Sequence, residues 1–178
     1  MTHQIIMAGF GGQGVMSMGK ILAEAGLKEG KNVSWLPSYG PEMRGGTANC
    51  SVIVSDEPVG APTVTEATAV VAMNKPSLDK FEKDVIPGGV LLINSSLIEQ
   101  KSTRDDIKVY YVPANDIATE LGTDKIANMV MLGAYLKASD AAKEDTIMEY
   151  IAEVFSGKKA SVIPLNKEAL KRGAEYIK

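Results

Sequence analysis

Residues 5–14 read IIMAGFGGQG, an apolar run that passes directly into a cluster of glycines. The apolar half is typical of a buried strand, and the glycines fit the pattern G-x-G-x-x-G from Gly9 to Gly14. From Val15 to Lys28 apolar residues recur at helical spacing, so a helix follows the glycines at once. The stretch therefore predicts an α/β fold that opens with a strand, a glycine loop and a helix.

Outward from this unit, apolar and β-branched runs alternate with helical patterns. We expect further strands at 31–36, 47–55, 67–73, 90–94 and 109–112, and helices at 77–85, 115–121, 126–138, 144–155 and 167–177. A turn is expected at 87–89, which reads PGG. The alternation predicts one three-layer α/β/α, Rossmann-like domain over residues 1–178 with a mainly parallel sheet. No helical pattern connects Leu36 to Thr47, which leaves room for an antiparallel strand and a mixed sheet.

The composition argues against several classes of function. The 178 residues are 45% hydrophobic and 23% charged, as in a soluble globular domain. The formal net charge of -3 argues against a nucleic-acid partner, because neutralising phosphates needs a basic surface. Glycines interrupt the first apolar run too early for a signal peptide, and no stretch reaches the roughly 18 apolar residues of a membrane span. We therefore expect a cytoplasmic protein without a membrane partner.

A single cysteine and a single histidine limit the chemistry of the chain. Cys50 cannot form an internal disulfide, and an iron–sulfur cluster takes about four thiolates. His3 lies near the N-terminus and offers no sensible Cys–His pair or metal site. We therefore expect no catalytic residue and no metal ligand in this chain. Cys50 is expected to be a small core residue of its strand.

The glycine loop has the features of an anion site. Between a strand and a helix, Gly9, Gly11, Gly12 and Gly14 let the backbone approach a ligand, while free N–H groups and the positive helix end attract phosphate. Gln13 adds an amide that could reach a polar ligand group. A close strand–helix turn that binds nothing is the alternative.

An ordinary dinucleotide site needs an acidic residue at the end of the second strand to bind the ribose hydroxyls. Residues 35–38, at the end of that strand, read WLPS, and the nearest carboxylate, Glu42, lies several residues into the following loop. The phosphate half of the motif is present without the ribose half. NAD is therefore disfavoured as the ligand.

A second loop, residues 38–47, reads SYGPEMRGGT. In a doubly wound fold it leaves the sheet at the same edge as the glycine loop. Its candidate ligand contacts are Ser38, Tyr39, Glu42, Arg44, Gly45 and Gly46. Arg44 carries a permanent cation with a planar fork of donors, and the glycines permit unusual backbone conformations near a ligand. A solvated surface loop is the alternative.

Three stretches together resemble the gamma subunits of 2-oxoacid:ferredoxin oxidoreductases. They are residues 5–14, residues 34–50 (SWLPSYGPEMRGGTANC) and residues 128–134 (NMVMLGA). The resemblance implies a subunit of an enzyme that converts a 2-oxoacid, coenzyme A and oxidised ferredoxin into acyl-CoA, carbon dioxide and reduced ferredoxin. It places thiamine diphosphate and iron–sulfur clusters on alpha, beta and delta-type partner subunits. The isolated chain is then expected to be inactive, and a homodimer of it is left open.

The resemblance also suggests coenzyme A as a shared ligand. Coenzyme A has a pyrophosphate but no free 2′,3′-diol, so a missing ribose carboxylate is no obstacle. On this hypothesis residues 11–14 hold the anion, Arg44 assists, and Asn128 lines the same edge from its helix. Residues 34–50 look most like the 2-oxoglutarate or branched-chain 2-oxoacid members of the family.

Three other interpretations remain open. The chain could be the smaller subunit of an indolepyruvate oxidoreductase, which would share both loops. It could be a stand-alone NAD-dependent oxidoreductase, although no ribose carboxylate or proton-transfer residue is apparent. It could also be a purely structural subunit whose glycine loop packs against a neighbour.

Overall fold

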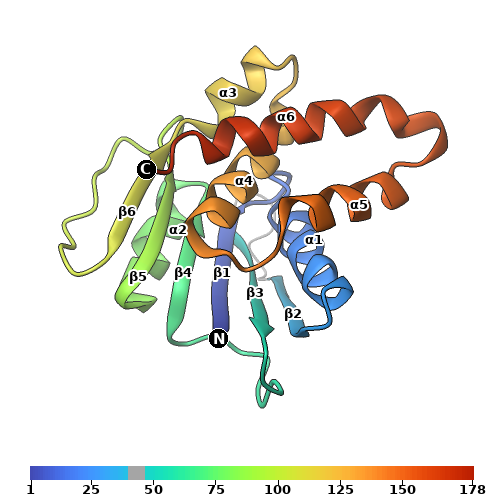
Figure 1. The fold of residues 1–178 in the computed structure, drawn as a ribbon. Helices are drawn as coiled ribbons and strands as arrows, with labels where there is room; N and C mark the ends of the chain where they lie inside the picture. The colour runs from blue at the N-terminus through green and yellow to red at the C-terminus, as the bar shows by residue number, and fades with distance from the viewer. Residues whose placement is uncertain (40–46) are drawn as a thin grey trace.

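The computed structural model describes residues 1–39 and 47–178, with a six-stranded sheet at the centre (Figure 1). The strands are β1 (Thr2–Phe10), β2 (Asn32–Tyr39), β3 (Thr47–Ser55), β4 (Ala67–Ala72), β5 (Val85–Asn94) and β6 (Lys108–Val112). Their order across the sheet is β2-β3-β1-β4-β5-β6. Strands β1, β4, β5 and β6 are parallel, and β3 runs antiparallel to both of its neighbours. The expected α/β fold with a mainly parallel sheet is confirmed.

Strand β3 lies between β1 and β2 and makes the sheet mixed. Only residues 40–46 separate β2 from β3, and a parallel crossover needs a dozen or more residues. Phe10 pairs with Thr47, and Tyr39 pairs with Ala48. The second loop therefore starts and ends at the edge of the sheet where β1 enters the glycine loop, as the sequence predicted.

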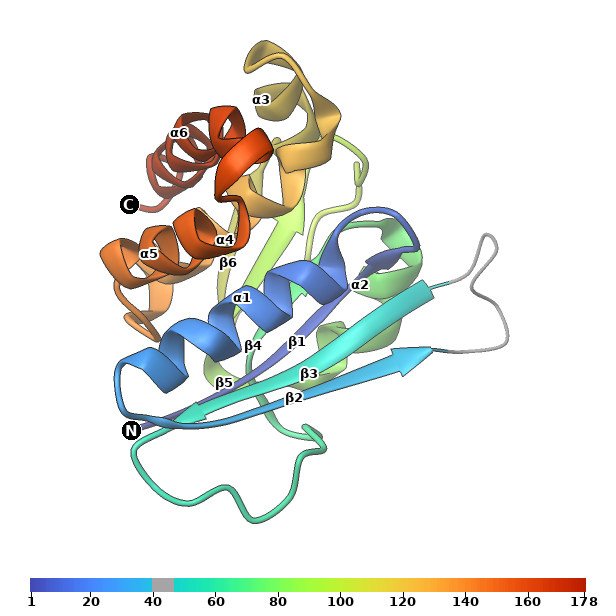
Figure 2. The same cartoon turned by 90° about the vertical axis from the view of Figure 1, so that its right-hand side faces the viewer.

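The helices cover the two faces of the sheet unequally. They are α1 (Val15–Lys28), α2 (Lys75–Phe81), α3 (Ala114–Glu120), α4 (Ala127–Ser139), α5 (Glu144–Val154) and α6 (Ile163–Ala174). Figure 2 shows α1, α4, α5 and α6 on one side of the sheet and α2 on the other. Helix α4 lies between the sheet and α6, and all its residues from 127 to 136 are buried. That position explains why its sequence is apolar nearly all round.

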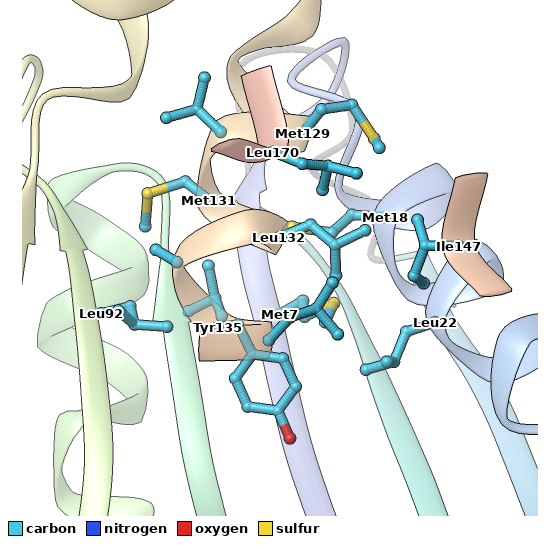
Figure 3. Packing of buried hydrophobic residues seen from close by; sticks show 14 of the residues in the cluster. Met7, Met18, Leu22, Leu92, Met129, Met131, Leu132, Tyr135, Ile147 and Leu170 are labelled. Atoms are coloured by element: carbon cyan, nitrogen blue, oxygen red, sulfur yellow. The ribbon is translucent and has the colours of Figure 1, made fainter. Parts of the chain in front are cut away.

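The larger hydrophobic core fills the space between the sheet and these helices (Figure 3). Met7 of β1, Leu92 of β5, Met18 and Leu22 of α1, and Tyr135 of α4 are each fully buried there. A smaller core packs the other face of the sheet against α2.

The helix expected at 77–85 has different bounds. It starts at Lys75, because the side chain of Asn74 accepts the N–H of Ser77 at 2.9 Å and caps the first turn. It ends at Phe81, and a short 3-10 segment, residues 82–84, leads into β5 at Val85. The prediction over 82–85 was therefore wrong.

The expected turn at 87–89 lies within the bounds of β5. Ala67 of β4 pairs with Val85, whereas Ala69 pairs with Val90, so β5 carries extra residues opposite β4. This irregularity takes up residues 87–89, and the strand continues past them. The last helix starts at 163 instead of 167, with a proline in its first turn, where the missing N–H costs nothing.

Glu29 fixes the turn before α5 to the end of α1. Its carboxylate accepts the N–H of Lys143 at 2.7 Å and lies 3.4 Å from Nζ of Lys31, and its side chain is 13% exposed. Burial works against ionisation, but hydrogen bonds from Lys143 and Thr146 and the charge of Lys31 outweigh it. Together they lower the pKa of Glu29 from its ordinary value of 4.5.

Glu29→Gln should reduce the free energy of unfolding at pH 7 by about 1 kcal/mol, because a charge-assisted hydrogen bond becomes a neutral one. Because the pKa of Glu29 is lower in the folded than in the unfolded protein, its ionised carboxylate stabilises the fold at any pH above the unfolded pKa of 4.5. This stabilisation is lost as the pH falls from 4.5 through the folded pKa. The difference between wild type and variant should therefore shrink below pH 4.5. Urea denaturation across this pH range measures it, with the exposed Glu99→Gln as control. A difference that does not change with pH would contradict this assignment.

Candidate functional site

The glycine loop closes on itself through one side chain. Gly12 and Gly14 have φ angles of 88° and 75°, in the left-handed region that favours glycine. The N–H of Gln13 donates to the carbonyl of Phe10 at 3.2 Å, and Oε1 of Gln13 accepts the N–H of Phe10 at 2.6 Å. Gln13 therefore orders the turn through its amide oxygen. Only its NH2 group is left to meet a ligand.

The loop leaves several backbone donors for a ligand. Helix α1 starts after Gly14 with no side-chain cap and no acidic residue in its first turn. Its first N–H groups lack intrahelical partners, and its positive end has no neutralising charge nearby in sequence. Within residues 1–39 and 47–178, no hydrogen bond engages the N–H of Gly12. The arrangement suits an anion.

A pocket of about 280 Å³ opens beside these donors. It is lined by Gly12, Gln13, Met73, Asn115, Asp124, Lys125 and Ala127. A Cβ atom on Gly12 would meet no other atom within 4 Å, so the open space reaches the peptide itself. The pocket lies where β1 and β4 end and where α1 and α4 begin, the edge at which α/β sheets bind ligands. Its volume suits a ligand fragment such as a pyrophosphate better than a whole ligand of drug size.

Sequence reasoning missed the wall of the pocket opposite the glycine loop. Asn115 comes from the first turn of α3, and Asp124 and Lys125 come from a short 3-10 segment, residues 124–126, before α4. No motif marks these residues. The available signal was topological, because the segment that follows each parallel strand returns to the same edge of the sheet.

Asn128 lies against the glycine loop, as expected, but its amide is already engaged. The side chain is 7% exposed, Nδ2 donates to the carbonyl of Gly14 at 3.1 Å, and Oδ1 accepts the N–H of Met129 at 2.9 Å. Asn128 therefore holds the backbone of Gly14 in place. A direct contact between Asn128 and a ligand stays a prediction.

The remaining predicted residues fall into two groups. Gly9 is buried at the end of β1, where a Cβ would come within 2.6 Å of Oε1 of Gln13 and 2.9 Å of Cβ of Met73. Gly11 and Ser38 are exposed at the same edge. Tyr39 is the last residue of β2. Outside the described residues lie Glu42, Arg44, Gly45 and Gly46, whose roles stay predictions.

A larger cavity, of about 770 Å³, lies at the opposite edge of the sheet, where α1 ends and α5 begins. Its walls carry three lysines and three acidic residues, of which Glu29 and Lys31 lie 3.4 Å apart. Glu29 accepts the N–H of Lys143, and Nζ of Lys31 donates to the carbonyl of Ala141 at 2.9 Å. These contacts tie the helix corner together. The smaller pocket is the candidate site because it adjoins the open peptide of Gly12 and the uncapped start of α1.

The sequence matches the family described as pyruvate ferredoxin/flavodoxin oxidoreductase over residues 4–176. The chain belongs to this family. Ketoisovalerate oxidoreductase subunit VorA of Methanothermobacter marburgensis is 42% identical over 176 residues, which are 98% of this chain and 36% of VorA. The chain thus spans little more than a third of that relative.

Two solved structures of the family share the fold. The keto/oxoacid ferredoxin oxidoreductase gamma subunit from Geobacter sulfurreducens superposes with a TM-score of 0.83 and 28% identity, covering 98% of this chain and 97% of that one. The second structure is the 2-oxoglutarate:ferredoxin oxidoreductase from Magnetococcus marinus, with 2-oxoglutarate, coenzyme A and succinyl-CoA bound. It superposes with a TM-score of 0.90 and 25% sequence identity, covering 99% of this chain and 32% of that one. The α/β fold of this chain is therefore that of a gamma subunit.

Cys50 in this family member has the surroundings of a core residue. It is fully buried, and its Sγ lies 3.6 Å from the carbonyl of Val15. Burial raises the pKa of the Cys50 thiol to about 12, although the side chain of Trp35 favours the thiolate. The thiol is therefore protonated at neutral pH and is a poor nucleophile.

The part of the chain that the structure describes lacks two further kinds of feature. Across residues 1–39 and 47–178, no three His, Cys, Asp or Glu side chains gather closely enough to bind a metal ion. Over the same residues, no helix has the length and apolar character needed to cross a membrane.

Proposed function

We propose that this chain is the gamma subunit of a 2-oxoacid:ferredoxin oxidoreductase and that its glycine loop binds the pyrophosphate of coenzyme A. Family membership supports the subunit role, as does a likeness that covers nearly all of the Geobacter sulfurreducens gamma subunit. The enzyme joins the acyl group of a 2-oxoacid to coenzyme A, releases carbon dioxide and passes two electrons to ferredoxin. Alpha, beta and delta-type partner subunits hold the thiamine diphosphate and the iron–sulfur clusters.

The observation that carries the ligand proposal is the open space beside Gly12. It adjoins the uncapped start of α1, so a bound anion would meet free N–H groups and the positive end of a helix. Lys125 and Asp124 also line the pocket and add one charge of each sign, so the backbone N–H groups and the helix end are the features that favour an anion. The Magnetococcus marinus relative holds coenzyme A in its structure, which supports coenzyme A as the ligand.

In this proposal the chain positions coenzyme A and makes no bond to the reacting atoms. Its backbone donors hold the phosphates, so the thiol at the other end of the ligand can reach a partner subunit. The free energy gained by binding the phosphates, which do not react, holds the thiol of coenzyme A in the orientation needed for reaction. Arg44, from the second loop, is proposed to assist in holding the anion.

The enzyme purified from its native source with its partner chains tests this function. We expect turnover with 2-oxoglutarate or 3-methyl-2-oxobutanoate, in preference to pyruvate or indolepyruvate. Arg44→Ala should raise the KM for coenzyme A and leave the KM for the 2-oxoacid unchanged, because the two ligands bind at different places. An Arg44→Ala enzyme with an unchanged KM for coenzyme A would remove this residue from the site. The absence of partner chains would overturn the subunit role.

A further inference from the structure

We propose that Asn115 is a second anion-binding side chain of the glycine-loop pocket, and that the buried Asn94 is the positioning residue that fixes its NH2 group as the donor. The inference rests on the proposed function of the pocket. It adds two residues that no motif in the sequence marks: Asn115, which lines the pocket, and Asn94, which donates a hydrogen bond to Asn115.

Asn94 is the last residue of β5 and is fully buried. Its Oδ1 accepts the N–H of Ala114 at 3.2 Å. Its Nδ2 donates to the carbonyl of Met73 at 3.2 Å and to Oδ1 of Asn115 at 2.8 Å. A reversed amide would place its NH2 group against an N–H and its oxygen against two oxygens. The orientation of the Asn94 amide is therefore determined by its partners.

The orientation of Asn94 determines that of Asn115. Because Oδ1 of Asn115 accepts from Asn94, the group that Asn115 still offers is its NH2. In the part of the chain that the structure describes, this NH2 group has no hydrogen-bond partner. Asn115 lines the same pocket as Gly12. A ligand placed between them meets donors from both sides.

The hydrogen bonds of Asn94 also explain why the NH2 group of Asn115 is held rigidly. Met73 follows β4, Asn94 ends β5, and Ala114 starts the helix after β6. The three hydrogen bonds of Asn94 therefore tie together the ends of three parallel strands. A donor held in this way loses little conformational freedom when it binds, which favours an oxyanion with several lone pairs to satisfy. The pocket thus suits a phosphate group held on two sides.

The test measures the affinity for coenzyme A by calorimetry in the assembled enzyme. Asn115→Ala should weaken binding about tenfold through the loss of one hydrogen bond to a charged group. Asn115→Asp should weaken it about a hundredfold or more, because a second carboxylate, in addition to that of Asp124, would face the pyrophosphate. Pantetheine, which lacks the pyrophosphate, should bind all three proteins equally. This last readout separates an anion contact from a general loss of structure.

Asn94→Asp tests the positioning role, since it keeps the shape and replaces a donor with an acceptor. Asn115 must then turn its amide and present an oxygen to the pocket, and we expect about tenfold weaker binding of coenzyme A. Asn166→Ala is the matched control, because Asn166 is a buried amide that donates to the carbonyl of Val162, away from the pocket. If Asn94→Asp does not fold, the two Asn115 variants still decide the question.

The possible outcomes separate this inference from the proposed function. Coenzyme A affinities within twofold of wild type in both Asn115 variants, together with lost binding in Gly12→Val, would overturn the inference and leave the proposed function intact. An unchanged affinity in Gly12→Val as well would overturn both. Equal losses of affinity for pantetheine and coenzyme A would assign Asn115 a structural role only.

Discussion

Gly173→Ala should lower the free energy of unfolding by about 3 kcal/mol or more, although alanine is normally the better helix former by about 1 kcal/mol. Gly173 is buried in α6 where that helix crosses α4. A Cβ atom there would overlap the carbonyl oxygen of Val130 and lie 3.1 Å from the backbone nitrogen of Ala134. Both neighbours are backbone atoms of a fully packed helix, so neither can move aside. The helices would have to separate.

Urea denaturation of wild type and variant measures this effect. Gly133→Ala should lower the free energy of unfolding by a similar amount to Gly173→Ala, because a Cβ atom on Gly133 of α4 would overlap the carbonyl of Leu170 on α6. Lys171→Ala, on the exposed side of α6, is the control and should change stability by less than about 0.5 kcal/mol. A stabilised Gly173→Ala protein would show that the two helices do not meet backbone to backbone.

Gly12→Val should abolish detectable coenzyme A binding, with an expected loss of about a hundredfold or more in affinity. The side chain would enter the open space beside the loop peptide, where a ligand oxygen is proposed to lie. Valine at a φ of 88° is also strained, so part of any effect could come from the backbone. A control with the same strain is therefore needed.

Gly30→Val supplies that control. Gly30 has a φ of 79° and lies in the turn at the other end of α1, where a Cβ atom would meet no other atom within 4 Å. Both substitutions should reduce stability by a similar amount, measured by thermal unfolding. Only Gly12→Val should lose coenzyme A, measured by calorimetry in the assembled enzyme. Equal affinities in the two variants would place the ligand elsewhere.

The first half of the site could be predicted from the sequence because it is local. The strand, the glycines and the helix of residues 5–28 follow one another directly, and periodicity alone indicates each of them. Of the three glycines that the G-x-G-x-x-G spacing marks, Gly14 has a positive φ angle, whereas the other glycine with a positive φ in this loop, Gly12, lies at a position that the motif leaves free. The short link between β2 and β3 likewise left open the antiparallel strand that the structure contains.

The second half of the site could not be predicted because it is made by long-range contacts. Asn115 and Lys125 reach the glycine loop only because β4, β5 and β6 run parallel to β1 and end at one edge. A single polar residue in the first turn of a helix or in a short 3-10 segment carries no periodic signal that would single it out. The role of Asn94 could not be predicted for a different reason. The sequence shows only a polar residue at the end of an apolar strand and does not indicate which groups it hydrogen-bonds.

Hydrogen–deuterium exchange of the assembled enzyme, with and without coenzyme A, tests the glycine loop as an anion site most directly. Coenzyme A should slow amide exchange in the segment 9–18, because the ligand would accept hydrogen bonds from the N–H groups there that have no acceptor in the protein, such as that of Gly12. Exchange in residues 28–32, at the other end of α1, should stay the same. If coenzyme A binds and residues 9–18 exchange at an unchanged rate, their N–H groups do not hold the ligand.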